Sequence, residues 1–181
     1  MALIYFIGEQ YLKDKTVLSN NIDIELITPN IEYSQDSHIQ PLLGSKFYNS
    51  LQLSYSAQTL NNYEVELVNL IKPALAYRSA EASLPFINLQ IRNKGINKLN
   101  SENAVQADLA DMKYLRDTLQ SRSEFYEKRI QDYLCLNGNH FPDYTNPDSP
   151  IAPNQSSVFD CDLYFKPSPC GDNSNCNCGN C

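Results

Sequence analysis

The most informative feature of this chain is the chemistry that it lacks. Among its 181 residues there is no tryptophan, and there are only two histidines and six glycines. It has no glycine-rich phosphate loop, no nucleophile elbow and no paired metal-ligand motif. His38 is expected on the buried side of a helix and His140 just past a helix end, so packing and surface roles are predicted for them. We therefore expect a protein that is not an enzyme and that holds no cofactor.

The chain is also poor in basic residues and in long apolar runs. Acidic residues outnumber basic ones by 21 to 14, which gives a net charge of −7. A general nucleic-acid binder needs a basic face, and this balance argues against one. The apolar run from Ala2 to Ile7 is short, and no run approaches the length of about 20 residues that crosses a bilayer. We expect synthesis in the cytosol and no membrane partner.

Apolar periodicity predicts a mainly α fold, a compact bundle of about four helices with a small β-hairpin and a long extended C-terminal arm. The clearest helix covers about residues 107–137. Another covers 62–84, with Val65 in its buried stripe and with Pro73 expected to kink or split it. A short helix capped by Ser45 is expected before it.

Nearer the N-terminus, a short strand is expected at residues 3–6, followed by a helical turn or two at 9–13. The next helix begins at Ile24, capped by Asp23, or else at Pro29, capped by Thr28. Gly44 is expected to end that segment, since glycine is common just after a helix.

A hairpin is predicted near residues 89–99, with its turn at Asn93-Lys94-Gly95. Arg92, Lys94 and Lys98 place three positive charges near the tip. Two interpretations stay open. The hairpin is an ordinary solvated one, or it is a projection that meets an acidic partner or DNA passing through a channel.

We divide the chain into a helical domain with the hairpin at 1–138, an extended proline-rich arm at 139–169 and a tail rich in cysteine, asparagine and glycine at 170–181. Proline prevents helix throughout the arm. Disorder is one interpretation, but a solvated linker rarely keeps so many large apolar groups, so we predict that the arm docks on a neighbouring subunit. Deleting residues 141–181 should then leave the core folded. The interface candidates are Phe141, Tyr144, Ile151, Val158, Phe159, Tyr164 and Phe165.

The tail holds four clustered cysteines, which are Cys170, Cys176, Cys178 and Cys181. Four thiols can bind Zn²⁺ tetrahedrally, although one of the spacings is poor for a zinc knuckle. Free thiols in a reducing cytosol and a disulfide between subunits are the other interpretations. We expect no metal, and a small binding module with a metal-binding tail is the alternative function.

Several segments, taken in order, resemble one known family. They are Ile39-Gln40-Pro41-Leu42-Leu43-Gly44 followed by Tyr48, Ile71-Lys72-Pro73-Ala74-Leu75-Ala76-Tyr77, Leu84-Pro85-Phe86, Asn93-Lys94-Gly95 and the helix from Tyr114 to Leu134. Over roughly residues 1–165 the chain resembles the head–tail connector proteins of tailed bacteriophages, also called neck-ring or head-completion proteins, and in particular those of the crAss-like phages. The cysteine-rich tail is not part of the resemblance.

The resemblance implies a structural virion protein that assembles in the host cytoplasm. It implies a homo-oligomeric ring of about twelve copies at the head–tail junction, closed by contacts between unlike surfaces. The ring would dock on the portal protein, contact other neck or tail ring proteins and extend the DNA channel toward the tail. DNA would pass without specific binding, and no catalytic residues carry over. A monomeric enzyme or host-takeover factor is the remaining hypothesis.

Overall fold

The computed structural model describes residues 4–16, 18, 22–92, 95–98, 109–145 and 150–153. These residues are mainly helical, which confirms the predicted class. The elements in chain order are α1 (Glu9–Lys15), α2 (Ile24–Ser34), the π-helix η1 (Gln35–Ile39), α3 (Gln40–Leu43), α4 (Ser45–Ala57), α5 (Asn62–Asn88), β1 (Leu89–Arg92), β2 (Gly95–Lys98), α6 (Leu109–Leu136), the 3₁₀ turn η2 (Gly138–His140) and α7 (Pro142–Thr145).

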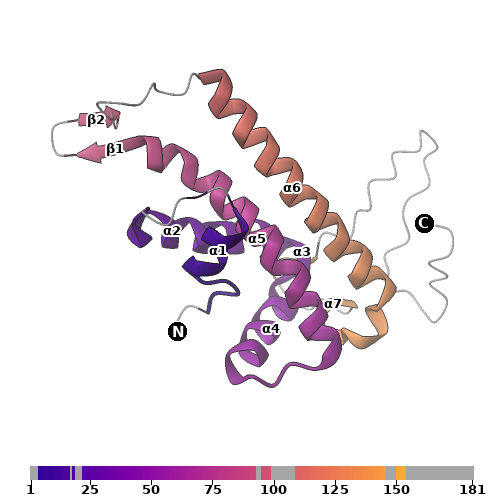
Figure 1. Cartoon of the computed structure of the whole chain (residues 1–181). Coiled ribbons are helices and arrows are strands. Elements are labelled where there is room, and N and C mark those ends of the chain that lie inside the picture. Colours follow the sequence, from indigo (N-terminus) through magenta and orange to yellow (C-terminus); the bar gives the residue numbers. More distant parts are fainter. Residues whose placement is uncertain are drawn as a thin grey trace, which may run out of the picture.

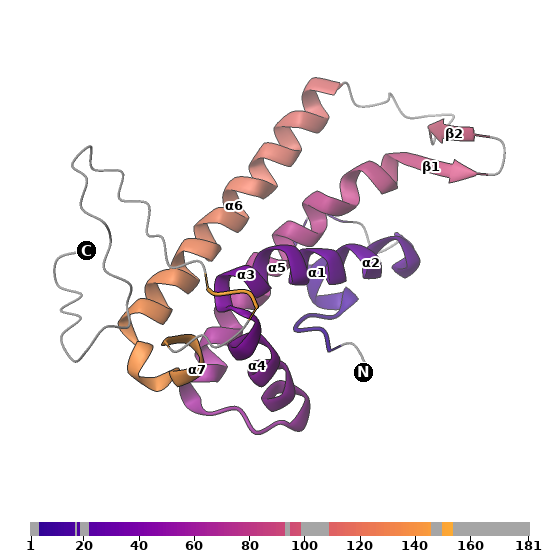
Figure 2. The same cartoon turned by 180° about the vertical axis from the view of Figure 1, so that it is seen from behind.

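The two long helices, α5 and α6, run antiparallel and pack along each other (Figure 1). The shorter helices α1 to α4 gather beside α5, and α7 lies next to α4 at the end where α6 finishes (Figures 1 and 2). At the opposite end β1 continues directly from α5 and pairs with β2 in an antiparallel ladder, from Leu89 opposite Lys98 to Arg92 opposite Gly95. The described fold is therefore a helical base from which the α5–α6 pair extends.

Helix α5 passes through Pro73 and Pro85 without a break, so the predicted split at Pro73 is wrong. Proline removes one helical hydrogen bond, but the residues that follow it, Ala74 and Leu75, are completely buried. Packing against the rest of the core holds the helix together. Its first turn is fixed by a capping box, in which the Asn61 side chain accepts the Glu64 N–H and the Glu64 carboxylate accepts the Asn61 N–H.

The N-terminal segment does not form the predicted strand. Residues 4–8 are irregular and are held by the buried side chain of Gln35 in η1. Its carbonyl accepts the Phe6 N–H at 3.0 Å, and its amide donates to the Ile4 carbonyl at 2.9 Å. A side-chain amide thus replaces the partner strand, and it places the Phe6 ring in the core.

Helix α2 begins at Ile24, which was one of the two predicted starts. Pro29, the other predicted start, lies inside the helix. The start at Pro29 is therefore wrong. Asp23 occupies the N-cap position, but its side chain makes no capping hydrogen bond, so only the place of the cap was predicted correctly. The tertiary contacts of Ile27 and Ile31, both buried, stabilise this helix instead.

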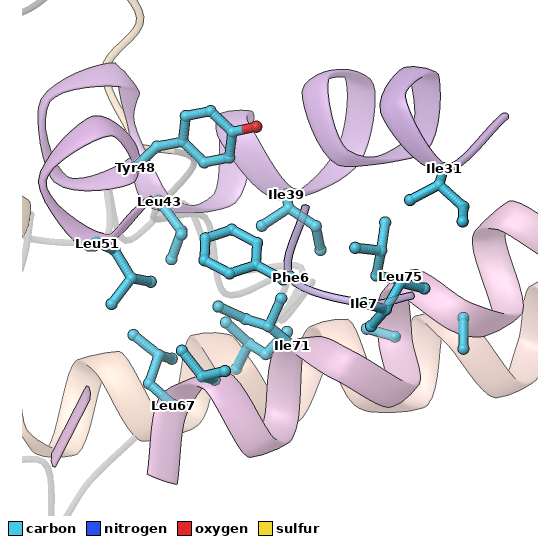
Figure 3. Close-up of a cluster of buried hydrophobic side chains, with 14 of the residues drawn as sticks. Phe6, Ile7, Ile31, Ile39, Leu43, Tyr48, Leu51, Leu67, Ile71 and Leu75 are labelled. Carbon is cyan, nitrogen blue, oxygen red and sulfur yellow. The ribbon is translucent and has the colours of Figure 1, made fainter. Parts of the chain in front are cut away.

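The core lies between α5 and the shorter helices. Phe6 is completely buried and meets Tyr48 and Tyr55 edge to face, with ring centroids 6.1 and 5.4 Å apart. Figure 3 shows the Phe6 ring between the side chains of α5 and those of η1, α3 and α4. The labelled members of this cluster are Phe6, Ile7, Ile31, Ile39, Leu43, Tyr48, Leu51, Leu67, Ile71 and Leu75.

The beginning of the predicted arm belongs to this core. Phe141 and Tyr144 are 1% and 3% exposed, and both rings pack on Phe47 of α4, with centroids 5.2 and 6.3 Å apart. Their prediction as contacts with a neighbouring subunit is wrong, because the Pro142 turn folds the chain back onto its own helices. Residues 138–145 form η2 and α7 in place of an extended arm.

Residues 150–153 pack on the same side of the molecule. The Ile151 carbonyl accepts the N–H of Ser45, the first residue of α4, at 3.0 Å. Gly44 has a φ of +76°, and a Cβ at this position would lie 2.8 Å from Cδ of Pro153. Glycine is required here by both its backbone conformation and the close approach of the chain. The side chain of Ile151 itself is exposed.

Candidate functional site

Four charged side chains meet beside the contact between α5 and α6. The Arg78 guanidinium donates from Nε to one Glu127 oxygen at 2.8 Å and from Nη2 to the other at 3.2 Å, which is a bidentate pair. It also donates to Glu81 at 3.0 Å, and Arg116 reaches Glu81 from α6 at 3.3 Å. The Arg78 and Glu127 side chains are only 11% and 17% exposed. This network ties the two long helices together.

Hydrogen bonds and charge keep Glu127 ionised despite its burial. Burial alone would raise the pKa of this carboxyl, but the Arg78 guanidinium and the Ser123 hydroxyl outweigh it and lower the pKa below its ordinary value. Ser123 is itself buried, and its hydroxyl lies 3.2 Å from the Ala74 carbonyl and 2.9 Å from Glu127. A shifted pKa marks catalytic groups and structural ion pairs alike. The shift of Glu127 is explained chiefly by Arg78 of α5 and Ser123 of α6.

His38 in η1 lies within the electrostatic reach of this network. Burial lowers the pKa of its imidazole, the Arg78 charge lowers it further, and the charges of Glu127 and Glu81 act in the opposite direction. The pKa remains below the ordinary value of 6.5. His38 is half-buried, so the position expected for it on the buried side of a helix is met only in part.

His38 should make the fold sensitive to mild acid. Its pKa is lower in the folded than in the unfolded chain, so the unfolded state binds the proton first, and stability should fall as the pH drops below about 6.5. His38→Gln should flatten the dependence of the free energy of unfolding on pH between about 7 and 5. Urea titrations across this range measure it, with His140→Gln, which replaces the other histidine, as control. An unchanged slope in His38→Gln would contradict the assignment.

A second cluster lies on the surface at the same pair of helices. We call it the aromatic–arginine surface, and it consists of Tyr11, Tyr77, Arg122, Phe125, Tyr126 and Arg129. The rings of Tyr77 and Tyr126 are stacked with centroids 6.0 Å apart and planes at 16°, and Phe125 meets Tyr126 edge to face at 5.3 Å. The cluster therefore bridges α5 and α6 with aromatic rings.

Both arginines lie over these rings. The Arg122 guanidinium carbon is 5.7 Å from the Tyr77 centroid, and that of Arg129 is 5.8 Å from Phe125 and 5.9 Å from Tyr126. Each distance is within the range of a cation–π contact. Among the described residues, neither arginine has a carboxylate within salt-bridge distance. In the described part of the chain, no carboxylate therefore neutralises their charge.

Tyr11 of α1 extends the surface. Burial raises the pKa of its hydroxyl. The Tyr126 and Tyr77 hydroxyls lie close enough to raise this pKa further. Lys15 lies 5.9 Å above the Tyr11 ring. Phe125 is 59% exposed and both arginines are exposed. On a chain of net charge −7, this is a local basic and aromatic spot.

This arrangement favours binding over catalysis. Tyrosine, phenylalanine and arginine are enriched at protein–protein interfaces, where rigid rings and a weakly hydrated cation contribute most of the affinity. No group of three or more potential metal ligands comes together within the described ranges. Nor does any described helix have the length and apolarity to cross a membrane.

The predicted site residues lie elsewhere or cannot be placed. Arg92 and Lys98 lie in the paired strands, where the backbone alone is described, and Lys94 lies outside the described residues. The remaining interface candidates and the four tail cysteines also lie outside the described residues. They are Val158, Phe159, Tyr164, Phe165, Cys170, Cys176, Cys178 and Cys181. Sequence reasoning missed the aromatic–arginine surface, although Arg122, Phe125, Tyr126 and Arg129 follow helical spacing.

The described residues form a mainly α-helical protein that exposes a cluster of aromatic rings and arginines. Its residues 39–154 match the model of a protein family of unknown function, DUF6712, and the chain belongs to this family. No curated protein and no solved structure matches it. The matched range includes both long helices, α7 and the contact of Pro153 with Gly44.

Proposed function

We propose that this protein is a structural component of a tailed-phage virion, forming a homo-oligomeric ring of about twelve copies at the head–tail junction. The ring docks on the portal protein, meets further neck or tail ring proteins and extends the DNA channel. It is assembled in the host cytoplasm, and it performs no catalysis. The ordered segments that resemble connector proteins support this assignment, and the geometry of the described helices is compatible with it.

The observation that carries the proposal is the aromatic–arginine surface, in which the described residues leave Phe125, Arg122 and Arg129 exposed. Phe125 projects from α6 with most of its surface exposed, and two arginines without carboxylate partners in the described residues flank it. Single exposed apolar residues are common, but a cluster that joins rings and cations is typical of an interface. A ring requires such a face on every copy.

The shape of the helical pair also suits a ring. Helices of 27 and 28 residues are about 40 Å long at 1.5 Å per residue, and α5 and α6 run side by side from the base toward β1 and β2 (Figure 1). The shorter helices cover one side of α5, and α6 leaves a long exposed flank for a neighbour. DNA would pass the ring without specific binding, since a net negative wall does not hold a negative polymer.

Electron microscopy and mass photometry test the proposal. The purified full chain, alone or mixed with the portal protein encoded by the same genome, should form closed rings of about twelve copies. A chain that remains monomeric under both conditions would show that the proposed function is wrong.

A further inference from the structure

We propose that the aromatic–arginine surface of one copy binds the acidic, apolar segment of residues 158–165 from the neighbouring copy. This inference rests on the proposed ring. The two surfaces that close the ring are then the aromatic–arginine surface on the described helices and residues 158–165, which follow them in the sequence. This segment replaces Phe141 and Tyr144, which the structure places in the core.

The sequence of the segment complements the surface. Residues 158–165 read Val-Phe-Asp-Cys-Asp-Leu-Tyr-Phe, with two carboxylates and no base among five large apolar side chains. The surface offers the opposite charge, from Arg122 and Arg129, beside exposed aromatic area. Opposite charges guide encounter and set register, and apolar burial supplies affinity.

The attachment point gives the segment its reach. Pro153 is buried against Gly44 at the start of α4, so the chain is anchored to the core at residue 153. Twelve residues, from 154 to 165, can span about 40 Å when extended. This is comparable with the length of α6, a helix of 28 residues.

Ring geometry favours the neighbour over the same copy. Rings with cyclic symmetry are closed by head-to-tail contacts, in which each copy contributes two different, complementary surfaces. The segment and the aromatic–arginine surface are such a pair, since one is acidic and the other basic. Each copy would then give its segment to one neighbour and receive a segment from the other.

A charge exchange between two full-length variants tests this contact. Arg129→Asp reverses a charge on the receiving surface, and Asp160→Arg reverses a charge on the segment. Each variant alone then places like charges opposite each other and should need an about tenfold higher protein concentration to form rings. In an equimolar mixture, copies can alternate so that Asp160 meets Arg129 and the new arginine meets the new aspartate. The mixture should therefore recover the wild-type concentration dependence.

Lys113→Asp is the matched control, because it makes the same charge change at another exposed position of α6 and should assemble like the wild type. A mixture that assembles no better than its two components would overturn the proposal, because a contact within one copy cannot be rescued by mixing. Single variants that assemble normally would overturn it as well. If the wild-type chain never forms rings, the proposed function fails and this contact fails with it.

Discussion

Phe141→Ala should lower the free energy of unfolding by about 3–5 kcal/mol, the usual cost of removing a buried phenylalanine side chain. The ring is 1% exposed, and it packs on Phe47 of α4 and on Tyr133 of α6, with centroids 5.2 and 6.2 Å apart. Alanine would leave a cavity where three elements meet. Urea denaturation followed by circular dichroism measures the loss.

Phe125→Ala is the control, because it removes the same side chain from a site that is 59% exposed. Its effect should stay within about 0.5 kcal/mol. Truncation before residue 141 should destabilise the chain at least as much as Phe141→Ala, contrary to the expectation from sequence that the core ends near residue 138. Equal stabilities of the two alanine variants would show that Phe141 does not hold the fold together.

Glu127→Ala should lower the free energy of unfolding by about 3 kcal/mol, because it leaves the buried Arg78 guanidinium without its bidentate partner. Glu81 remains at 3.0 Å from Arg78, so the loss should lie at the lower end of the range for a broken buried pair. The loss should shrink as the pH falls below about 4.5, the ordinary pKa of this carboxyl, because the stabilisation from its lowered pKa is complete above that value and disappears as the folded carboxyl is protonated.

Glu124→Ala is the matched control. Its carboxylate lies 4.0 Å from the same guanidinium, but the side chain is 53% exposed. Such a pair contributes about 0–1 kcal/mol, so the variant should be close to the wild type in stability. A double variant, Arg78→Met with Glu127→Leu, should recover part of the loss, because no unpaired charge remains. If Glu127→Ala and Glu124→Ala behave alike, the network does not link the helices.

The sequence predicted the helices best where apolar spacing was long and regular. The helix expected at 107–137 corresponds to α6, in which Leu119, Ile130 and Leu134 are buried. Local signals were less reliable. Pro73 did not end α5, because burial of the following residues outweighs one lost hydrogen bond, and Val65, expected in the buried stripe, is exposed.

The contacts between distant segments could not be predicted from local patterns. Nothing in the neighbourhood of Gln35 indicates that its amide will replace a partner strand for residues 4–6. In the same way, the prolines after residue 138 indicated extended chain, whereas the decisive factor is the apolar face of Phe47. The aromatic–arginine surface joins three helices, so its residues come together only in the folded chain.

The contact between Gly44 and Pro153 has a consequence for the order of events during synthesis. The ribosome delivers the N-terminal helices first, but the start of α4 finds its partner more than a hundred residues later, at the Ile151 carbonyl and the Pro153 ring. Until then, the face of Phe47 that receives Phe141 stays open to water. The nascent chain therefore exposes an apolar face that can aggregate until residues 141–153 have been synthesised. Slow translation of these residues would prolong the time in which a chaperone is needed to protect this face.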